Sequence, residues 1–317
     1  MDFSVVAVAR EDDSAVEEPL RVAVAADRLG YREVWAGEGP TWDAFVLATA
    51  IGRSTESVAL TAGPVPVSVR DPLTIVRGAA SCAAVTGRPV GVALGTSSKR
   101  VVEGVHGRAR VRPAAVLEES AAAVRALLPV APGEPVVPGS GFRRRHRAPG
   151  GPLTVAAFGD RAVGTAARHA DRMLLDMVSP DQVRELRAKL HAAADRAGRT
   201  PPTLAAWLPA AVDPGPASLA QILRGIAGYL TVPGYREVFA AAGFGEAVRR
   251  AAAGEDPRVP EAAAGVMGLV GDLDAVRARV EAYAEAGLDE IALVPATAGD
   301  PGGERTLRAF ARLPGWA

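Results

Sequence analysis

Short runs of apolar, largely β-branched residues alternate along the chain with longer stretches in which apolar residues recur at helical spacing. The short runs are almost continuously apolar, which is typical of parallel strands buried on both faces. We therefore predict eight strands. They span Phe3–Ala9, Glu33–Glu38, Val58–Val65, Val90–Thr96, Leu153–Gly159, Arg172–Val178, Leu204–Val212 and Glu290–Pro295.

Three of the helices predicted between the strands have clear ends, because a glycine follows each of them; they span Pro19–Leu29, Pro180–Ala197 and Asp274–Ala286. Ser179 precedes the second of these helices and is a favoured N-cap residue. A repeated strand–helix unit indicates a closed barrel or a doubly wound open sheet. An open dinucleotide-binding sheet needs a glycine-rich turn after its first strand, whereas residues 10–13 contain no glycine. With eight units, the predicted fold is a (β/α)8 TIM barrel of the α/β class.

Two stretches interrupt this rhythm within what we predict to be a single domain over residues 1–317. Residues 130–152 are rich in proline, glycine and arginine and include the basic run RRRHR. They predict an inserted hairpin with a solvated loop, although such an arginine cluster also suits the charged tail of a ligand. Residues 218–264 are helical but too long for one crossover, so they predict extra helices beside the substrate mouth.

Composition narrows the class of protein. Hydrophobic residues make up 49% of the chain and charged residues 23%, which favours a large core and argues against disorder. The 36 basic and 36 acidic residues balance, which argues against a basic surface of the kind that nucleic acid requires. The first apolar run is short and is followed by acidic residues, and no run reaches membrane-spanning length. We expect a cytoplasmic protein with neither a nucleic-acid nor a membrane partner.

The cysteine and histidine content argues against thiol or metal chemistry. The single cysteine, Cys82, lies in a run of small apolar residues, which predicts a core position. The four histidines are far apart and show neither HxH nor HExxH spacing, so no metal is predicted. His106, which follows the fourth strand, is the histidine best placed for chemistry.

Functional residues of a (β/α)8 barrel gather after the carboxyl ends of its strands. Glu38 ends the second predicted strand and is either a catalytic carboxylate or a cap for the next helix and a partner for an arginine. Trp42 is either a packing residue or a wall of an aromatic cofactor pocket. After the fifth strand, Gly159 and Arg161 stand at the start of a helix, where backbone N–H groups and positive charge suit a phosphate.

The third and fourth predicted strands end in unusual segments. The Gly63–Pro64 step lies inside an apolar strand, where proline removes a ladder donor. It predicts either a bulge, with a cis peptide as one means of forming it, or an ordinary strand end. Residues 95–100 read GTSSKR, and this mixture of small residues, hydroxyl groups and cations suits an anion or the edge of a ring.

Several segments carry a resemblance to a known family. VWAGEGPTWDAF lies at the second strand, LTAGPVPVSVRDPLT at the third, and ALGTSSKRVVEGVHG is similar to the family signature LGTS…VVEGWHG. Over nearly its whole length the chain resembles the bacterial luciferase-like monooxygenase superfamily, in particular its F420-dependent oxidoreductases. It departs from the family pattern at Val105, where relatives often have tryptophan, and at Arg161, where they often have lysine.

The resemblance implies a luciferase-like barrel with the ring of coenzyme F420 in its mouth, or FMN as the alternative cofactor. It places the phosphate end near Gly159 and Arg161, and we predict Glu38 or His106 as the general acid or base. The predicted cofactor-binding residues are Glu38, Trp42, Thr61, Gly63, Pro64, Val65, Gly95, Thr96, Ser97, Gly159, Arg161 and Met177.

The implied function is hydride transfer between F420 and a small organic substrate, carried out by a homodimer. Two alternatives stay open on the sequence: an FMN-dependent monooxygenase of the same fold, and a non-catalytic relative that only binds a cofactor or partner. The segments that would select the substrate, including residues 231–246, are mostly alanine, glycine and aromatic residues, which predicts an apolar pocket.

Overall fold

The computed structural model describes residues 1–313, and its nine strands form a single sheet of parallel pairs. The strands are β1 (Asp2–Ala7), β2 (Glu33–Ala36), β3 (Ala59–Pro66), β4 (Val90–Gly95), β5 (Gly150–Ala156), β6 (Arg172–Asp176), β7 (Thr203–Val212), β8 (Leu269–Gly271) and β9 (Glu290–Pro295). Strands β1 to β7 pair in chain order, β7 pairs with β9, and β9 returns to β1. Eight parallel strands therefore close a barrel, which confirms the predicted TIM-barrel fold.

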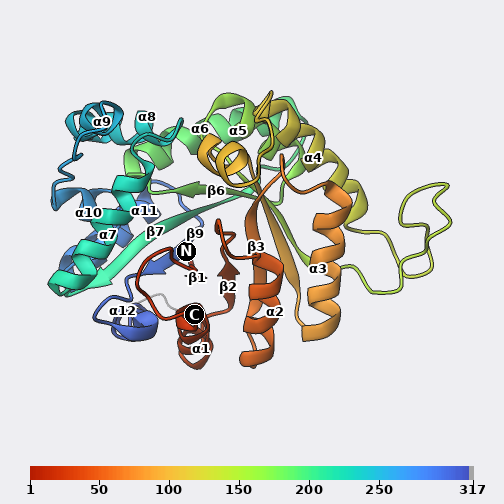
Figure 1. The fold of residues 1–317 in the computed structure, drawn as a ribbon, viewed down its shortest axis with the longest axis horizontal. Helices are drawn as coiled ribbons and strands as arrows, with labels where there is room; N and C mark the ends of the chain where they lie inside the picture. Colours follow the sequence, from red (N-terminus) through yellow and green to blue (C-terminus); the bar gives the residue numbers. More distant parts are fainter. Residues whose placement is uncertain (314–317) are drawn as a thin grey trace.

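Helices surround the barrel (Figure 1). They are α1 (Glu18–Arg28), α2 (Ala44–Ser54), α3 (Pro72–Thr86), the π-helical turn η1 (Arg100–Val105), α4 (Pro113–Leu127), α5 (Asp160–His169), α6 (Pro180–Arg196), α7 (Pro216–Tyr229), α8 (Tyr235–Phe239), the π-helical turn η2 (Ala240–Phe244), α9 (Gly245–Ala252), α10 (Ala262–Val266), α11 (Leu273–Glu285), the 3-10 turn η3 (Pro301–Gly303) and α12 (Glu304–Phe310). Ser179 caps α6 by accepting the N–H of Gln182, as predicted. Within the described residues, no helix is long and apolar enough to cross a membrane.

The eight predicted strands are confirmed, and their ends differ from the observed ones by at most three residues. The ninth strand, β8, was not predicted. It has three residues, lies between glycines, and pairs with the carboxyl-terminal part of β7 outside the closed ring. A run this short carries too little periodicity to be recognised as a strand.

Side chains that point into the barrel form layers, as in other barrels of this size. The middle layer is apolar and consists of Val6, Trp35, Ala93, Leu174, Ala205 and Ala292. Residues on the opposite face of the strands, such as Val5, Leu94 and Leu175, pack against the surrounding helices in the main core. The single cysteine, Cys82, is buried in that core from α3, as predicted.

Between α4 and β5 the chain folds back on itself, with one antiparallel bridge between Pro135 and Arg143. The N–H of Val136 donates to the carbonyl of Phe142 at 2.9 Å, and the N–H of Arg144 donates to Glu134 at 2.9 Å. In Figure 1 this segment projects from the body of the barrel. The guanidinium of Arg144 is buried and donates to the last carbonyls of α4, including that of Leu127 at 2.9 Å. These hydrogen bonds fix the hairpin to the end of α4.

The predicted extra helices are also present, as α7 to α10. They share a separate hydrophobic cluster that includes Ile226, Phe239 and Met267 and reaches Met177 at the end of β6. The side chain of Tyr235 on α8 lies 2.7 Å from Asp176, the last residue of β6. This excursion is therefore attached to the carboxyl end of the barrel.

Candidate active site

The interior of the barrel opens at the carboxyl ends of its strands. Middle-layer side chains such as Trp35 and Ala93 are fully buried. One step further along the strands, interior side chains are only partly buried; they are Val8, Pro64, Ala156, Trp207 and Val294. Since these residues face inward and still contact solvent, the barrel is accessible from the end at which barrel enzymes carry out their chemistry.

Glycines give this opening a smooth wall. A Cβ on Gly95 would lie 3.1 Å from the Cβ of Pro64 and 3.9 Å from the Cβ of Ala156. A Cβ on Gly37 would lie 3.7 Å from the ring of Trp207. The absence of side chains at Gly37 and Gly95 thus lets Pro64, Ala156 and the ring of Trp207 pack closely around the opening.

A bulge in β3 completes this wall. The Gly63–Pro64 peptide is cis, and the register between β3 and β4 shifts between Ala62 and Val65, which confirms the predicted bulge. Gly63 has φ of 117°, and a Cβ there would lie 2.4 Å from the carbonyl oxygen of Ala93. Only glycine fits this position.

Trp207 on β7 lines the same opening, with its ring next to Gly37. Its ring meets the edge of the Trp35 ring, with 5.7 Å between centroids and an interplanar angle of 88°. The indole nitrogen Nε1 is buried and has no hydrogen-bond partner among the described residues. A buried N–H without an acceptor is costly, so a ligand oxygen or nitrogen next to it would be stabilised.

Asp176 stands beside Trp207, its register partner on β7. Its Oδ2 accepts a hydrogen bond of 2.7 Å from the hydroxyl of Tyr235. The ring of Tyr235 lies between those of Phe158 and Tyr229, at centroid distances of 5.0 Å and 4.6 Å. Burial raises the pKa of Asp176 to about 7, although the hydrogen bond from Tyr235 acts in the other direction.

Glu38 lies at the rim, and its oxygens are held by neighbours. Oε1 accepts from Arg70 at 2.8 Å and 2.9 Å, and Oε2 accepts from the N–H of Ala44 at 2.7 Å, at the start of α2. Arg70 also pairs with Asp43, the N-cap residue of α2, at 2.7 Å. These contacts correspond to the structural alternative for Glu38, a helix cap paired with an arginine.

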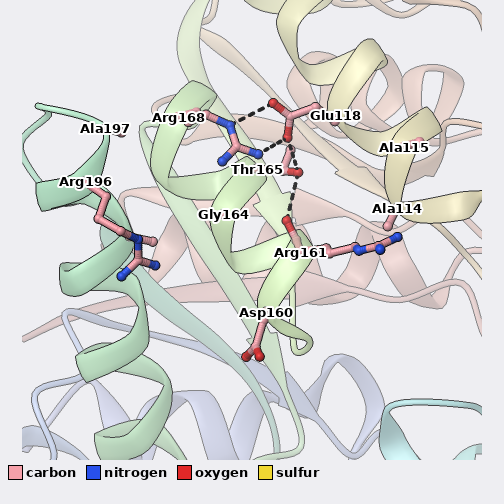
Figure 2. Close-up of a pocket in the computed structure, with 11 residues that line it drawn as sticks. Ala114, Ala115, Glu118, Asp160, Arg161, Gly164, Thr165, Arg168, Arg196 and Ala197 are labelled. Atoms are coloured by element: carbon pink, nitrogen blue, oxygen red, sulfur yellow. Dashed lines mark hydrogen bonds and ion pairs between the residues drawn. The ribbon is translucent and has the colours of Figure 1, made fainter.

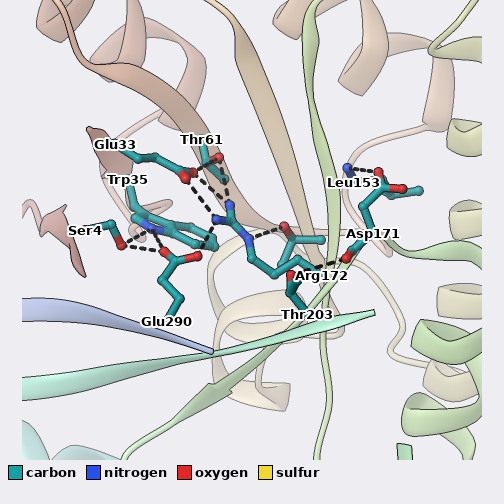
Figure 3. Close-up of polar contacts among 10 residues, drawn as sticks. Ser4, Glu33, Trp35, Thr61, Leu153, Asp171, Arg172, Thr203 and Glu290 are labelled. Atoms are coloured by element: carbon teal, nitrogen blue, oxygen red, sulfur yellow. Dashed lines mark hydrogen bonds and ion pairs between the residues drawn. The ribbon is translucent and has the colours of Figure 1, made fainter. Parts of the chain in front are cut away.

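Thr61 lies below the opening and has its hydroxyl engaged by the protein, so its contact with a cofactor ring stays a prediction. It is fully buried, donates to Glu33 at 2.5 Å and accepts from Arg172 at 3.2 Å. Figure 3 shows this network, in which Arg172 also pairs with Glu290 at 2.7 Å and stacks on the ring of Trp35. The network fills the amino-terminal end of the barrel, because its charged members are the first residues of β2, β6 and β9.

Two more side chains point away from the opening. Val65 is fully buried in the main core between sheet and helices, so only its backbone is available to a ligand. Met177 packs with the extra helices, and its N–H donates to the carbonyl of Trp207 at 3.0 Å. The sequence did not show these directions, because a bulge and a left-handed residue at Met177, with φ of 47°, interrupt the simple alternation.

Thr96 and Ser97 form a loop that Arg110 holds in place. The Nε of Arg110 donates to the carbonyl of Ser97 at 3.0 Å, and its Nη2 donates to the hydroxyl of Thr96 at 3.2 Å. The loop directly follows Gly95 and is partly buried. It is therefore an ordered edge of the opening, next to the glycine wall.

Gly159 and Arg161 stand at the start of α5, where Gly159 is the exposed N-cap residue. Arg161 is exposed and, in Figure 2, points toward Ala114 on α4. It lines a groove of about 430 Å³ on the outer surface, with Arg168 and Arg196 among the other residues. Arg161 thus lies outside the barrel interior, whereas the N–H groups at the start of α5 follow directly from β5.

The remaining predicted residues lie at the periphery. His106 is exposed at the end of η1. Trp42 is partly buried and packs on the main core. Within residues 1–313, no cluster of histidine, cysteine and acidic residues is placed to hold a metal ion.

Five side chains that define one half of the opening were not predicted as site residues: Phe158, Asp176, Trp207, Tyr229 and Tyr235. Asp176 carried a usable signal, because it is a carboxylate near the end of an apolar predicted strand. Its partner Tyr235 lies in the segment 231–246 that was predicted to select the substrate, but its pairing with Asp176, 59 positions earlier, left no signal in the sequence.

A closed (β/α)8 barrel that opens at the carboxyl ends of its strands, with glycines and a partly buried carboxyl group at the opening, is the architecture of a barrel enzyme. The sequence model of the family described as luciferase-like monooxygenase matches residues 1–290. The chain therefore belongs to the luciferase-like monooxygenase family, a family of oxidoreductases that act on small molecules.

Solved structures with the same fold include several enzymes. An F420-dependent secondary alcohol dehydrogenase in complex with an F420-acetone adduct superposes with a TM-score of 0.77 and 17% identity, covering 100% of this chain and 99% of that one. The coenzyme F420-dependent tetrahydromethanopterin reductase from Methanopyrus kandleri gives 0.76 and 16%, covering 98% and 97%. The monooxygenase RslO1 from Streptomyces bottropensis gives 0.69 and 24%, covering 100% of both chains. No match was found among curated protein sequences.

Proposed function

We propose that this protein is an F420-dependent oxidoreductase that transfers a hydride between the deazaflavin and a small organic substrate. The observation that carries the proposal is the glycine wall at the carboxyl end of the barrel. Gly37, Gly95 and the bulge at Gly63–Pro64 keep the walls of the opening close to the backbone, with Pro64, Ala156 and Trp207 as the side chains next to them. A planar ring in this opening would lie beside Trp207, with Asp176 close to it.

The residues present fit such a group. The orphaned Nε1–H of Trp207 offers a donor to a ring or substrate heteroatom. The loop of Thr96 and Ser97 borders the wall, and the N–H groups at the start of α5 suit a phosphate. When bound, a deazaflavin supplies a hydride acceptor or donor at one ring carbon and moves two electrons at a time. The protein then has to orient the substrate, exclude water and move a proton.

The choice of F420 over FMN rests on two supports. The segment ALGTSSKRVVEGVHG, residues 93–107, resembles the F420-dependent branch of the family. Two of the structural neighbours are F420-dependent enzymes by their descriptions. RslO1, described as a monooxygenase, supports the alternative, an FMN-dependent monooxygenase on the same wall.

Glu38 and His106 stay predictions as proton-transfer residues. Glu38 has both oxygens engaged by Arg70 and Ala44, so we assign it to shaping the rim. His106 is exposed on the loop that leads away from the wall. We further propose that the chain acts in the cytoplasm as a single-domain homodimer.

Cofactor titration tests the proposal. We expect the purified protein to quench the fluorescence of F420 at micromolar concentrations and to leave FMN fluorescence unchanged. Gly37→Leu should weaken F420 binding at least about tenfold, because its side chain would press on the ring of Trp207, 3.7 Å from the Cβ position, and narrow the opening. Gly225→Leu is the matched control, since a Cβ at Gly225 on α7 meets no atom within 4 Å. Binding of FMN without F420 would replace the proposal with the monooxygenase alternative.

A further inference from the structure

Asp176 is a carboxyl group in the barrel opening that has no cationic partner among the described residues. It is the last residue of β6, and it faces the same side of the strand as Arg172 and Leu174, which lie inside the barrel. Its register partner Trp207 also faces the interior. The carboxyl group is therefore directed toward the space above the middle layer.

Two titratable side chains interact with Asp176, and a third charged side chain, Arg10, interacts with one of these two. Tyr235 on α8 donates to Oδ2, and Tyr229 on α7 interacts electrostatically with Asp176. Arg10, after β1, acts on Tyr229 and donates to the carbonyl of Pro295 at 2.8 Å, so its charge is directed away from Asp176. Burial without a neighbouring cation keeps the pKa of Asp176 near 7.

The hydrogen bond from Tyr235 distinguishes the two oxygens of Asp176. Oδ2 accepts the hydroxyl hydrogen of Tyr235, and no described residue hydrogen-bonds Oδ1. The proton of the neutral acid therefore belongs on Oδ1. In contrast to Glu38, whose oxygens are occupied by Arg70 and a helix N–H, Asp176 keeps one oxygen available to a ligand.

On the basis of the proposed hydride transfer, we propose that Asp176 is the catalytic residue that exchanges a proton with the substrate, a neutral carbonyl compound with an aromatic or apolar body, or the corresponding alcohol. In the reducing direction, the carbonyl carbon takes a hydride with its two electrons from the reduced cofactor. The C=O π bond breaks, and the oxygen takes the proton from Oδ1 of Asp176. The reduced cofactor would supply both electrons with the hydride, and water would return a proton to the carboxylate of Asp176.

The surroundings of Asp176 define this substrate class. Phe158, Tyr229 and Tyr235 form a contiguous set of rings beside the carboxyl group, which suits an aromatic or apolar body. A neutral acid attracts no ion, so the substrate needs no charge of its own. Tyr235 is a positioning residue, because it fixes Oδ2 and leaves Oδ1 to carry the proton.

The first test needs no cofactor. Difference infrared spectroscopy follows carboxyl protonation from pH 5 to 9 in the cofactor-free protein. We expect one carboxyl band that titrates near pH 7 and is absent in Asp176→Asn. In Tyr235→Phe the midpoint should rise, because the hydrogen bond that stabilises the carboxylate is lost. Asp181→Asn, at an exposed position on α6, should leave the band unchanged.

The second test measures oxidation of reduced F420 by a panel of aryl ketones. We expect Asp176→Asn to slow turnover about 100-fold or more and to remove the loss of rate above pH 7, with F420 affinity changed less than threefold. Tyr235→Phe should shift that pH limb upward with a smaller loss of rate. Asp181→Asn should behave as the wild type.

The outcomes separate this inference from the proposed function. If the wild type binds F420 and Asp176→Asn turns over at an unchanged rate and pH profile, the role of Asp176 is overturned. The same conclusion follows if no carboxyl group titrates between pH 6 and 8. If the wild type does not bind F420 at all, the proposed function fails, whatever the carboxyl titration shows.

Discussion

Asp176 and Glu38 are both carboxylates at the carboxyl ends of strands, yet their surroundings give them different chemistry. Glu38 faces the guanidinium of Arg70 and the first N–H groups of α2, so its charge is compensated. Asp176 faces aromatic rings and one hydroxyl group, so no positive charge compensates its carboxylate. The position of a carboxylate at the end of a strand therefore suggests a function. Whether the carboxylate is paired or free depends on the cations that other elements place beside it.

The raised pKa of Asp176 makes a prediction about stability. Because the folded protein holds this proton up to about pH 7 and the unfolded chain releases it near pH 4, stability should fall as the pH rises between these values. Asp176→Asn removes this dependence. The unfolding free energy of the variant, relative to that of the wild type, should rise by about 1–3 kcal/mol between pH 4.5 and pH 8. Water at the opening screens the carboxylate and keeps the difference in this range. Urea denaturation at both pH values measures the difference, with Asp181→Asn as control. Parallel pH dependences of wild type and variant would contradict the prediction.

At the scale of elements, the helices of the barrel are joined by specific side chains as well as by the core. Glu118 on α4 accepts hydrogen bonds from three residues of α5: Arg168 at 2.9 Å, Thr165 at 2.6 Å and His169 at 2.7 Å. These donors, Arg168 first, lower the pKa of Glu118 to about 2. The group thus fixes α5, the helix whose start follows β5 at the opening.

Replacement of Glu118 by glutamine should lower the free energy of unfolding by about 1–2 kcal/mol at pH 7, after allowance for solvent screening at a partly exposed site. A lowered pKa stabilises the fold above the pKa of the unfolded glutamate, and this contribution is lost as the pH falls toward 2. The cost should therefore shrink between pH 5 and pH 3, which thermal unfolding across this range would reveal. The neighbouring Glu119→Gln is the control, since Glu119 forms only an exposed pair with Arg112 at 3.5 Å. Equal effects of the two variants would show that the contacts to α5 contribute nothing.

The elements themselves could be predicted from the sequence to a large extent, since periodicity and glycine stops are local signals. Eight strands, the bulge at Gly63–Pro64 and the cap at Ser179 all follow from residues within a few positions of each other. The site could be predicted only in part. The sequence predicts that Thr61 contacts the cofactor, but it does not reveal that the Thr61 hydroxyl is bound to Glu33 and Arg172 below the opening.

The missed half of the site has a physical explanation. Tyr229 and Tyr235 belong to an excursion whose position over β6 is determined by packing, not by local sequence. Periodicity reports which residues are buried, whereas the depth of a residue along the barrel axis depends on strand register. Register is a property of pairs of strands, and a single sequence does not reveal it.

At the scale of the whole molecule, the two ends of the barrel differ in packing and in charge. The carboxyl end is open and lined by glycines and rings, while the amino-terminal end is filled by a buried ionic network (Figure 3). Arg172 from β6 joins Glu33 from β2 and Glu290 from β9, and Thr154 and Thr61 accept its remaining hydrogen bonds. Arg172 thus connects strands from opposite sides of the ring. Its ion pairs at the amino-terminal end hold together the strands whose carboxyl ends form the opening.

Replacement of Arg172 by methionine should therefore destabilise the whole barrel, by about 3–5 kcal/mol, because it leaves the buried Glu290 and the partly buried Glu33 without a cation. Burial and the neighbouring Glu33 already raise the pKa of Glu290, against the opposing effect of Arg172. Without the arginine, proton uptake should relieve the repulsion, so the loss should be smaller at pH 5 than at pH 8. Chemical denaturation at pH 5 and pH 8 measures this loss of stability. The control is Arg184→Met, because Arg184 forms only an exposed ion pair on α6, with Asp181.

Adding Glu290→Gln to Arg172→Met should recover part of the stability, since one of the two uncompensated charges is removed. If the double variant is no more stable than Arg172→Met at pH 8, then Arg172 acts through its packing on Trp35 and not through its charge.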